Sequence, residues 1–281
     1  MMPLLCLFCV VFLVSIILWM IAPQRPSADM KMLFKEQKFA HRGLYNNENG
    51  IPENSMLAFQ RAIEKGYGIE IDVRLTKDKV PIIFHDGSLK RMCGDDRRPE
   101  MLTLAEIKNL RLLNTEEEIP TLEEFLKLVQ DKTNILVEFK TGLPGGDVNT
   151  LCLTVMNVMD RFSCHYIIES FDYSVLKWFR IYRPQVMRGQ LSMGYQCYVP
   201  ALGKTIARMI PLHRRLMISW LLYNYLARPH FISYRYQDAK LAFNICRMMG
   251  AMTSAWTVDR KDTEQALKGR FDAIIFEKFE P

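Results

Sequence analysis

The sequence predicts an α/β protein built as an irregular (β/α)8 TIM barrel and preceded by one N-terminal transmembrane helix. Short β-rich runs alternate with helical segments from residue 38 onward, and nine such runs follow one another. This number fits an eight-stranded barrel with one peripheral strand better than a doubly wound sheet. The predicted transmembrane helix is an uncharged apolar run at residues 4–22, close to the ~20 residues that cross a bilayer as a helix.

The first element in chain order is this apolar run. A cleaved signal peptide is the alternative, but no basic residue precedes the run and no A-x-A-like site follows it. Four basic residues come soon after it, at Arg25, Lys31, Lys35 and Lys38, and the positive-inside rule places that side in the cytoplasm. We therefore expect a single-pass protein of the cell membrane with a transmembrane anchor at 1–23, a linker at 24–37 and the rest of the chain in the cytoplasm.

In the domain that follows, 38–281, predicted strands alternate with predicted helices, as in a barrel of this type. Predicted strands occupy 38–41, 68–74, 80–85, 134–140, 166–170, 186–191, 231–235, 252–258 and 272–276. Predicted helices occupy 54–65, 103–110, 121–130, 147–161, 173–181, 238–249 and 262–268, with Asn54 and Thr121 as caps and Gly66 and Gly250 as stops. Only "TKDK" separates the second and third strands, too few residues for a crossover helix. One of these strands should therefore be peripheral.

Composition limits the functions that such a barrel can have. The net charge of +6 is modest, and no Lys/Arg run with interleaved aromatic residues occurs, so nucleic acid is not an expected partner. Of the seven cysteines, only Cys6 and Cys9 have CxxC spacing, and they lie inside the apolar N-terminal run, while the other five are scattered. This pattern indicates reduced thiols rather than a disulfide framework or a zinc site.

Charged residues mark the ends of the first four predicted strands. Glu70 and Asp72, two residues apart in "GIEIDVRLT", point to one face of a strand. Two like charges inside a barrel repel each other and lose hydration unless a cation lies between them, which indicates a divalent ion. The other strand ends carry His41 with Arg42, His85 with Asp86, and Glu138 with Lys140. Barrel enzymes place their chemistry at this edge.

Each of these side chains also has a structural interpretation. A strand-end histidine is often solvated, and an acidic pair is often the outer face of an edge strand. The apolar neighbours Ile69, Ile71 and Val73, and the recurrence of the pattern on successive strands, favour a site.

The chain resembles the glycerophosphodiester phosphodiesterase family of phospholipase-C-like phosphodiesterase barrels. The matching segments are "AHRG" (40–43), "PENS" (52–55), "EID" (70–72), "FHD" (84–86), "EFK" (138–140), "SF" (170–171) and "AWTV" (255–258). The resemblance implies that His41 and His85 are the catalytic acid–base pair. It further implies that Glu70, Asp72 and Glu138 bind Ca2+ or Mg2+, that Arg42, Lys140 and Trp256 bind substrate, and that Glu53 and Asp86 support the site.

The implied function is metal-dependent hydrolysis of glycerophosphodiesters to glycerol phosphate and an alcohol at the membrane. An alternative is a lysophospholipase D or a related phospholipase-C-like activity on a lipid substrate. A non-enzymatic alternative is a catalytically dead membrane scaffold that binds lipid headgroups, but the presence of both histidines and all three implied metal ligands disfavours it.

Two segments depart from the family pattern. The family usually has Thr-Asp-x-Pro after its last strand, where this chain has Phe276, Glu277 and Lys278. The second departure is a helical insertion at about 195–230, whose core, 203–231, mixes basic, aromatic and aliphatic residues. Its position after the sixth strand predicts that it lies on the catalytic face and contacts the membrane; an ordinary helical hairpin packed on the barrel is the alternative.

Overall fold

A computed structural model describes residues 2–142, 146–198 and 210–281. Its strands are β1 (Lys38–Ala40), β2 (Gly68–Leu75), β3 (Pro81–Ile83), β4 (Ile135–Phe139), β5 (Tyr166–Ser170), β6 (Arg188–Ser192), β7 (Phe231–Arg235), β8 (Met252–Val258) and β9 (Ala273–Phe276). Its α-helices are α1 (Met2–Ile21), α2 (Ala28–Phe34), α3 (Met56–Glu64), α4 (Lys90–Cys93), α5 (Leu104–Ile107), α6 (Leu122–Val129), α7 (Val148–Met159), α8 (Tyr173–Tyr182), α10 (Leu212–Ser219), α11 (Asn224–Ala227), α12 (Leu241–Met248) and α13 (Lys261–Leu267).

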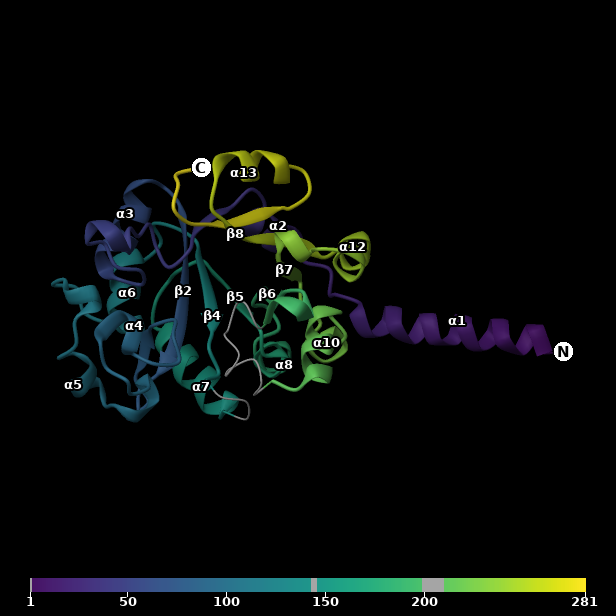
Figure 1. The fold of residues 1–281 in the computed structure, drawn as a ribbon, viewed down its shortest axis with the longest axis horizontal. Coiled ribbons are helices and arrows are strands. Elements are labelled where there is room, and N and C mark those ends of the chain that lie inside the picture. The colour runs from purple at the N-terminus through teal and green to yellow at the C-terminus, as the bar shows by residue number, and fades with distance from the viewer. Residues whose placement is uncertain (1, 143–145, 199–209) are drawn as a thin grey trace.

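Eight parallel strands close into a barrel, as the sequence predicts. The strand order is β1-β9-β8-β7-β6-β5-β4-β2, and β1 also pairs with β2, which completes the ring. β3 pairs with β2 in the antiparallel direction, so it is the peripheral strand that the short "TKDK" connection indicates. The helices surround the strands (Figure 1), and all eight residues of β2 are buried.

The structure differs from the predicted elements at several places. The N-cap of α3 is Ser55, whose side chain accepts a hydrogen bond from the Ala58 backbone N–H, rather than the predicted Asn54. The expected linker contains helix α2, which starts because the Ser27 side chain accepts a hydrogen bond from the Met30 backbone N–H. Phe34, at the end of α2, is buried against Phe231 at the amino ends of the strands. The helix predicted at 103–110 is only one turn, α5, and the chain then turns through Leu113, which has a φ of 51°.

The insertion lies along the side of the barrel rather than only on its catalytic face. Residues 199–209 are outside the described part, and α10 and α11 form the rest. Arg214 of α10 lies 3.7 Å from Asp172, which follows the carboxyl end of β5. The Ala227 carbonyl of α11 accepts a hydrogen bond from Arg188, at the amino end of β6. The described insertion therefore runs from the catalytic end of the barrel toward the opposite end.

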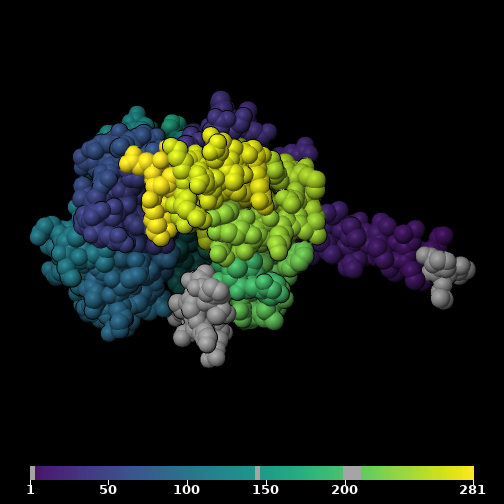
Figure 2. Space-filling model, turned by 45° about the horizontal axis from the view of Figure 1, so that its top comes forward, coloured from purple at the N-terminus to yellow at the C-terminus, as the bar shows by residue number. Residues whose placement is uncertain are grey.

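Helix α1 projects away from the domain (Figure 1, Figure 2). Its window Leu4–Ile21 has a mean hydropathy of 3.1 and is long and apolar enough to cross a membrane. A helix with these properties near an N-terminus is also what a signal sequence looks like.

Candidate active site

The carboxyl ends of β1, β2 and β4 bring most of the predicted site residues together. His41 and Arg42 follow β1, and the Arg42 backbone N–H donates to Glu70 on β2 at 2.9 Å. Arg42 and Gly43 have positive φ angles of 57° and 81°. A Cβ atom on Gly43 would lie 2.9 Å from Ala58, so only glycine allows this tight turn.

His41 is held by a residue that the sequence analysis left without a role. Its Nδ1 lies 2.8 Å from Oε2 of Glu277, and the Tyr45 hydroxyl donates to the same oxygen at 2.8 Å. Burial would raise the pKa of Glu277, but the hydrogen bond and charge of His41 outweigh it and lower that pKa to about 2. Burial, together with the Arg42 charge, lowers the pKa of His41 below its usual value. A neutral His41 that donates its Nδ1 proton to Glu277 leaves Nε2 free to exchange a proton.

His85 is held in the same manner at the end of β3. Its Nδ1 lies 2.7 Å from Oδ1 of Asp86, and its backbone carbonyl accepts two hydrogen bonds from Arg74. Burial and the charge of Lys140 lower the pKa of His85 to about 4. Each predicted catalytic histidine thus has its Nδ1 on a carboxylate, which fixes the ring and leaves Nε2 available.

Arg91 connects the two predicted supporting residues. Its guanidinium donates to both carboxylate oxygens of Glu53 at 2.7–2.8 Å and to Asp86 at 2.7 Å. Burial would raise the pKa of Glu53, but its hydrogen bonds, first of all with Arg91, lower it to about 2. Glu53 also pairs with Arg42. The supporting residues therefore form a continuous ion-pair chain between Arg42 and His85.

Three buried carboxylates form a compact group inside the barrel mouth, the opening at the carboxyl ends of the strands. Glu70, Glu138 and Glu169 each offer an oxygen within 4.8 Å of the others. Burial and then neighbouring carboxylates, Asp72 for Glu70 and Glu138 for Glu169, raise the pKa of both groups well above the usual range. Oε2 of Glu169 has no hydrogen-bond partner among the described residues. Clustered carboxylates with an unpartnered oxygen fit a hard divalent cation such as Ca2+ or Mg2+.

Asp72, the third predicted metal ligand, lies beside this group and is paired with other side chains. Its Oδ1 lies 3.0 Å from Nζ of Lys140, and its Oδ2 accepts a hydrogen bond from Asn54 at 2.9 Å. Lys140 also pairs with Glu138 at 2.6 Å. Although burial opposes it, the charge of Lys140 lowers the pKa of Asp72 well below its usual range. The compact carboxylate group therefore contains Glu169 where the sequence analysis has Asp72, which lies beside it.

Trp256 lies on β8, on another side of the same mouth. Its indole N–H donates to the Ser233 carbonyl at 3.1 Å, and its ring stands edge-on to Phe171, which follows β5. The fixed, partly exposed ring can form an apolar wall for a substrate.

Sequence reasoning missed Glu277, Glu169 and Arg91. Glu169 carried the same signal as Glu70, an acidic residue inside a buried strand, and it lies directly opposite Glu138 in the sheet register. Glu277 follows the last strand, where a carboxylate reaches the mouth. Arg91 lies in a loop helix, and nothing in its local sequence points to the site.

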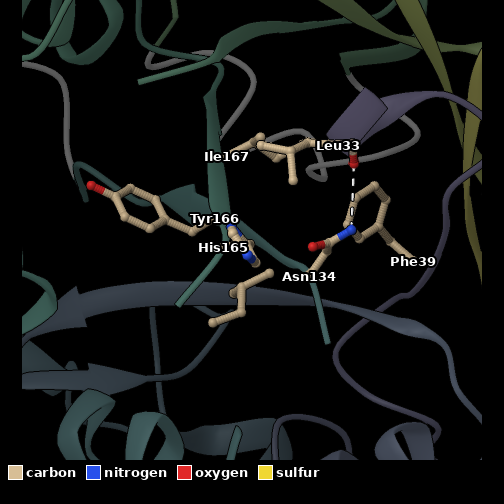
Figure 3. A pocket seen from close by; sticks show the side chains of 7 residues that line it. Leu33, Phe39, Asn134, His165, Tyr166 and Ile167 are labelled. Carbon is tan, nitrogen blue, oxygen red and sulfur yellow. Dashed lines mark hydrogen bonds between the residues drawn. The ribbon is translucent and has the colours of Figure 1, made fainter. Parts of the chain in front are cut away.

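A second recess lies at the other end of the barrel (Figure 3). It is lined by Leu33, Phe39 and the residues that begin β4 and β5, and Asn134 donates to the Leu33 carbonyl at 3.5 Å. It contains no carboxylate, and its one histidine is His165. This recess is part of the floor of the barrel, and none of the predicted catalytic or metal-binding residues lines it.

Comparison with known proteins gives a consistent result. The profile of the "Glycerophosphoryl diester phosphodiesterase family" matches residues 41–280. A "Glycerophosphodiester phosphodiesterase" of Caldanaerobacter subterraneus subsp. tengcongensis is 31% identical over 256 residues, 84% of this chain and 91% of that protein.

Solved structures show the same barrel. A phosphodiesterase from Oleispira antarctica, in complex with the product sn-glycerol-3-phosphate, has a TM-score of 0.67 at 22% identity and covers 88% of this chain and 94% of its own. A glycerophosphodiester phosphodiesterase from Thermotoga maritima has a TM-score of 0.63 at 24% identity, with 86% and 94% covered.

Proposed function

Because the chain belongs to the glycerophosphoryl diester phosphodiesterase family, we propose that its barrel mouth hydrolyses glycerophosphodiesters with a divalent metal and at a membrane surface. The protein is a phosphoric diester hydrolase that acts on glycerophosphodiesters. The observation that supports the site assignment is the pair of imidazoles, His41 and His85, each with its Nδ1 on a carboxylate. Such a pair can supply the base and the acid that phosphodiester hydrolysis requires.

The two histidines share the proton transfers. One Nε2 accepts a proton from the attacking hydroxyl, either of water or of the neighbouring glycerol carbon, and the other donates a proton to the leaving alkoxide. Glu277 and Asp86 keep the rings oriented during both transfers. The anionic phosphate favours the protonated form of an adjacent imidazole, which supplies the acid.

Positive groups in the mouth neutralise the phosphate. Arg42 and Lys140 lie beside the carboxylate group, and the charges of Asp72, Glu53 and Glu138 keep both cations protonated. Glu70, Glu138 and Glu169 would hold the divalent ion, with Asp72 next to them. The ion supplies Lewis-acid stabilisation of the charge that builds on the non-bridging oxygens. Trp256 would close one side of the substrate pocket.

The membrane location is supported by helix α1 and the basic residues that follow it. The span is apolar and almost fully exposed outside the domain. With Arg25, Lys31 and Lys35 on the domain side, the positive-inside rule places the barrel in the cytoplasm.

Substitution of each histidine by alanine tests the catalytic assignment. His41→Ala and His85→Ala should each lower kcat for release of glycerol 3-phosphate from glycerophosphocholine by roughly 10²–10⁴-fold. His165→Ala, at the opposite end of the barrel, is the matched control and should leave kcat unchanged. If either active-site variant keeps a rate close to that of the control, that histidine has no acid–base role.

The substrate and the ion need a separate measurement. Turnover of glycerophosphocholine, glycerophosphoethanolamine and a lysophospholipid, with Ca2+ or Mg2+ in turn, separates the glycerophosphodiesterase from the lysophospholipase D alternative. Faster turnover of the lysophospholipid would favour the alternative. Full activity in the presence of a strong chelator would exclude the proposed metal dependence.

A further inference from the structure

The carboxyl end of α1 is joined to the domain by side chains from the insertion and from α12. Asn224 donates to the Ile21 carbonyl at 2.8 Å, and Arg228 donates to the carbonyls of Trp19 and Ala22 at 2.9 and 2.8 Å. The Cys246 thiol also donates to Ile21. We call Asn224, Arg228 and Cys246 the anchor socket.

The socket supplies what a helix end needs. The last carbonyls of a helix have no partner inside the helix and carry partial negative charge, so amide, thiol and guanidinium donors stabilise them. Ile21 itself is 2% exposed and packs in one apolar cluster with Leu221, Phe243 and Cys246. The Arg228 guanidinium lies 5.2 Å above the Trp19 ring. Because α1 ends inside the domain core, it is a rigid part of the fold rather than a loose tether.

The contacts continue beyond the helix and place its base on one side of the barrel. Gln24 donates its backbone N–H to Pro229, just before β7, and Arg25 donates to Met249, just before β8. These residues lie at the amino ends of the strands, opposite the histidines. Helix α1 therefore leaves the domain beside α11 and α12, and Figure 1 shows its base near α12 and α10.

The part of the sequence that contains the socket residues is rich in basic residues. Between residues 173 and 258 there are twelve Lys or Arg residues and one acidic residue, Asp238. The whole chain has a net charge of +6, so the remaining residues have a net charge of −5. The basic segment forms α8, α10, α11 and α12, the helices beside the socket.

Exposed apolar side chains accompany these charges around the base of α1. Trp220 at the end of α10 is 47% exposed, and Leu241 and Met248 on α12 are 60% and 78% exposed. Lys240 and Arg247 stand next to the two α12 residues and are exposed. We call Trp220, Lys240, Leu241, Arg247 and Met248 the anchor face.

We propose that the anchor face rests on the anionic headgroups of the bilayer that α1 spans, so that the barrel lies with its side on the membrane. This inference depends on the proposed membrane span. Basic residues near an anionic surface are attracted to it, and tryptophan and long apolar side chains favour the boundary between headgroups and acyl chains. The socket holds the anchor face close to the bilayer, which makes these weak contacts effective.

Photo-crosslinking of the full-length protein in vesicles tests this orientation. A photoreactive amino acid replaces Met248 on the anchor face or, as the matched control, Met101, which is 59% exposed in the acidic part of the chain. In vesicles of phosphatidylcholine with phosphatidylglycerol, we expect a lipid adduct at position 248 and little at 101. The double variant Lys240→Glu with Arg247→Glu should lower the adduct at 248 by roughly fivefold or more, whereas Lys127→Glu with Lys132→Glu should not.

The outcomes separate this inference from the membrane span itself. If the protein resists alkaline carbonate extraction but gives equal adducts at 248 and 101, α1 spans the bilayer and the proposed orientation is wrong. If charge reversal on the anchor face leaves the adduct unchanged, the headgroup contact is also wrong. Extraction of the protein by carbonate would refute the membrane span and, with it, the orientation.

Discussion

Replacement of Glu277 by glutamine tests how the site orients its first histidine. The substitution keeps the side-chain size but removes the negative charge that lies 2.8 Å from Nδ1 of His41. A hydrogen bond that involves a charged group contributes about 1.5–3 kcal/mol, and each ~1.4 kcal/mol in the barrier is tenfold in rate. The kcat of Glu277→Gln should therefore fall by roughly 10- to 150-fold. KM should change little because Glu277 contacts His41 and Tyr45 rather than Arg42 or Lys140, the proposed phosphate-binding residues.

The pH dependence of kcat gives a second readout of the same substitution. Glu277 raises the pKa of His41 against the lowering effect of burial. Without that charge the pKa of His41 falls further, so the limb of the kcat profile that reports His41 should move to lower pH. If Glu277 has only a structural role, its substitution should lower the free energy of unfolding without moving this limb of the profile.

Two control variants make the result specific. Glu280→Gln removes a carboxylate from an exposed ion pair with Lys65 and should leave kcat unchanged. Tyr45→Phe removes a second hydrogen-bond partner of Glu277 but keeps the carboxylate on His41, so its effect should be smaller than that of Glu277→Gln. If Glu277→Gln keeps more than half of the wild-type kcat, or changes KM alone, the proposed orientation of His41 is wrong.

Three further predictions concern the carboxylates, the ion-pair chain and the first turn of the site. In the presence of chelator, the melting temperature should fall as pH rises above ~4.5, the pKa of unfolded glutamates. Burial raises the folded-state pKa of Glu169, so the proton that stabilises the folded state is lost as pH rises. Glu169→Gln should flatten the dependence of melting temperature on pH. Equal slopes for variant and wild type in differential scanning fluorimetry would contradict the raised pKa. Arg91→Ala separates the two supporting carboxylates and should lower kcat about tenfold. Arg97→Ala, which removes the ion pair with Asp95 outside the site, should not. Gly43→Ala should reduce the free energy of unfolding, measured in urea, by about 1–3 kcal/mol because Gly43 has a positive φ and a Cβ there would meet Ala58. Gly87→Ala is the control, since a Cβ at Gly87 would meet no neighbouring atom. An equal effect of both substitutions would refute the steric argument.

The barrel could be predicted from the sequence because its evidence is local. Each strand is a short apolar run, and the short "TKDK" connection indicated a peripheral strand, which the structure identifies as the antiparallel β3. Helix α2 was missed because its stabilisation is not local. Pro23, Pro26 and Ser27 read as a linker, whereas Phe34 is fixed by contact with Phe231, almost two hundred residues away.

The site was predictable only in part for a similar reason. A histidine at a strand end is visible in the sequence, but the carboxylate that orients it can come from any other strand end. Asp86 follows His85 directly, whereas Glu277 reaches His41 from the far end of the chain. Similarly, Glu169 joins Glu138 only because β4 and β5 are neighbours in the sheet. Such pairs become visible once the strand order and register are known.

The position of the anchor bears on which substrates the mouth can take. The sequence analysis treated the insertion as one membrane-contacting element, but the structure gives its Arg214, Arg215 and Trp220 different surroundings. Arg214 lies near Asp172 at the mouth, Arg215 donates to the Ile210 carbonyl, and Trp220 stands exposed beside the socket cluster. If the barrel lies on its side, its mouth opens along the membrane surface rather than into it. A glycerophosphodiester dissolved in water reaches that opening freely, whereas a lysophospholipid would first have to withdraw its acyl chain from the bilayer, at ~0.8 kcal/mol for each exposed CH2 group. In the proposed orientation, this geometry favours water-soluble glycerophosphodiesters, and the membrane would hold the enzyme rather than deliver its substrate.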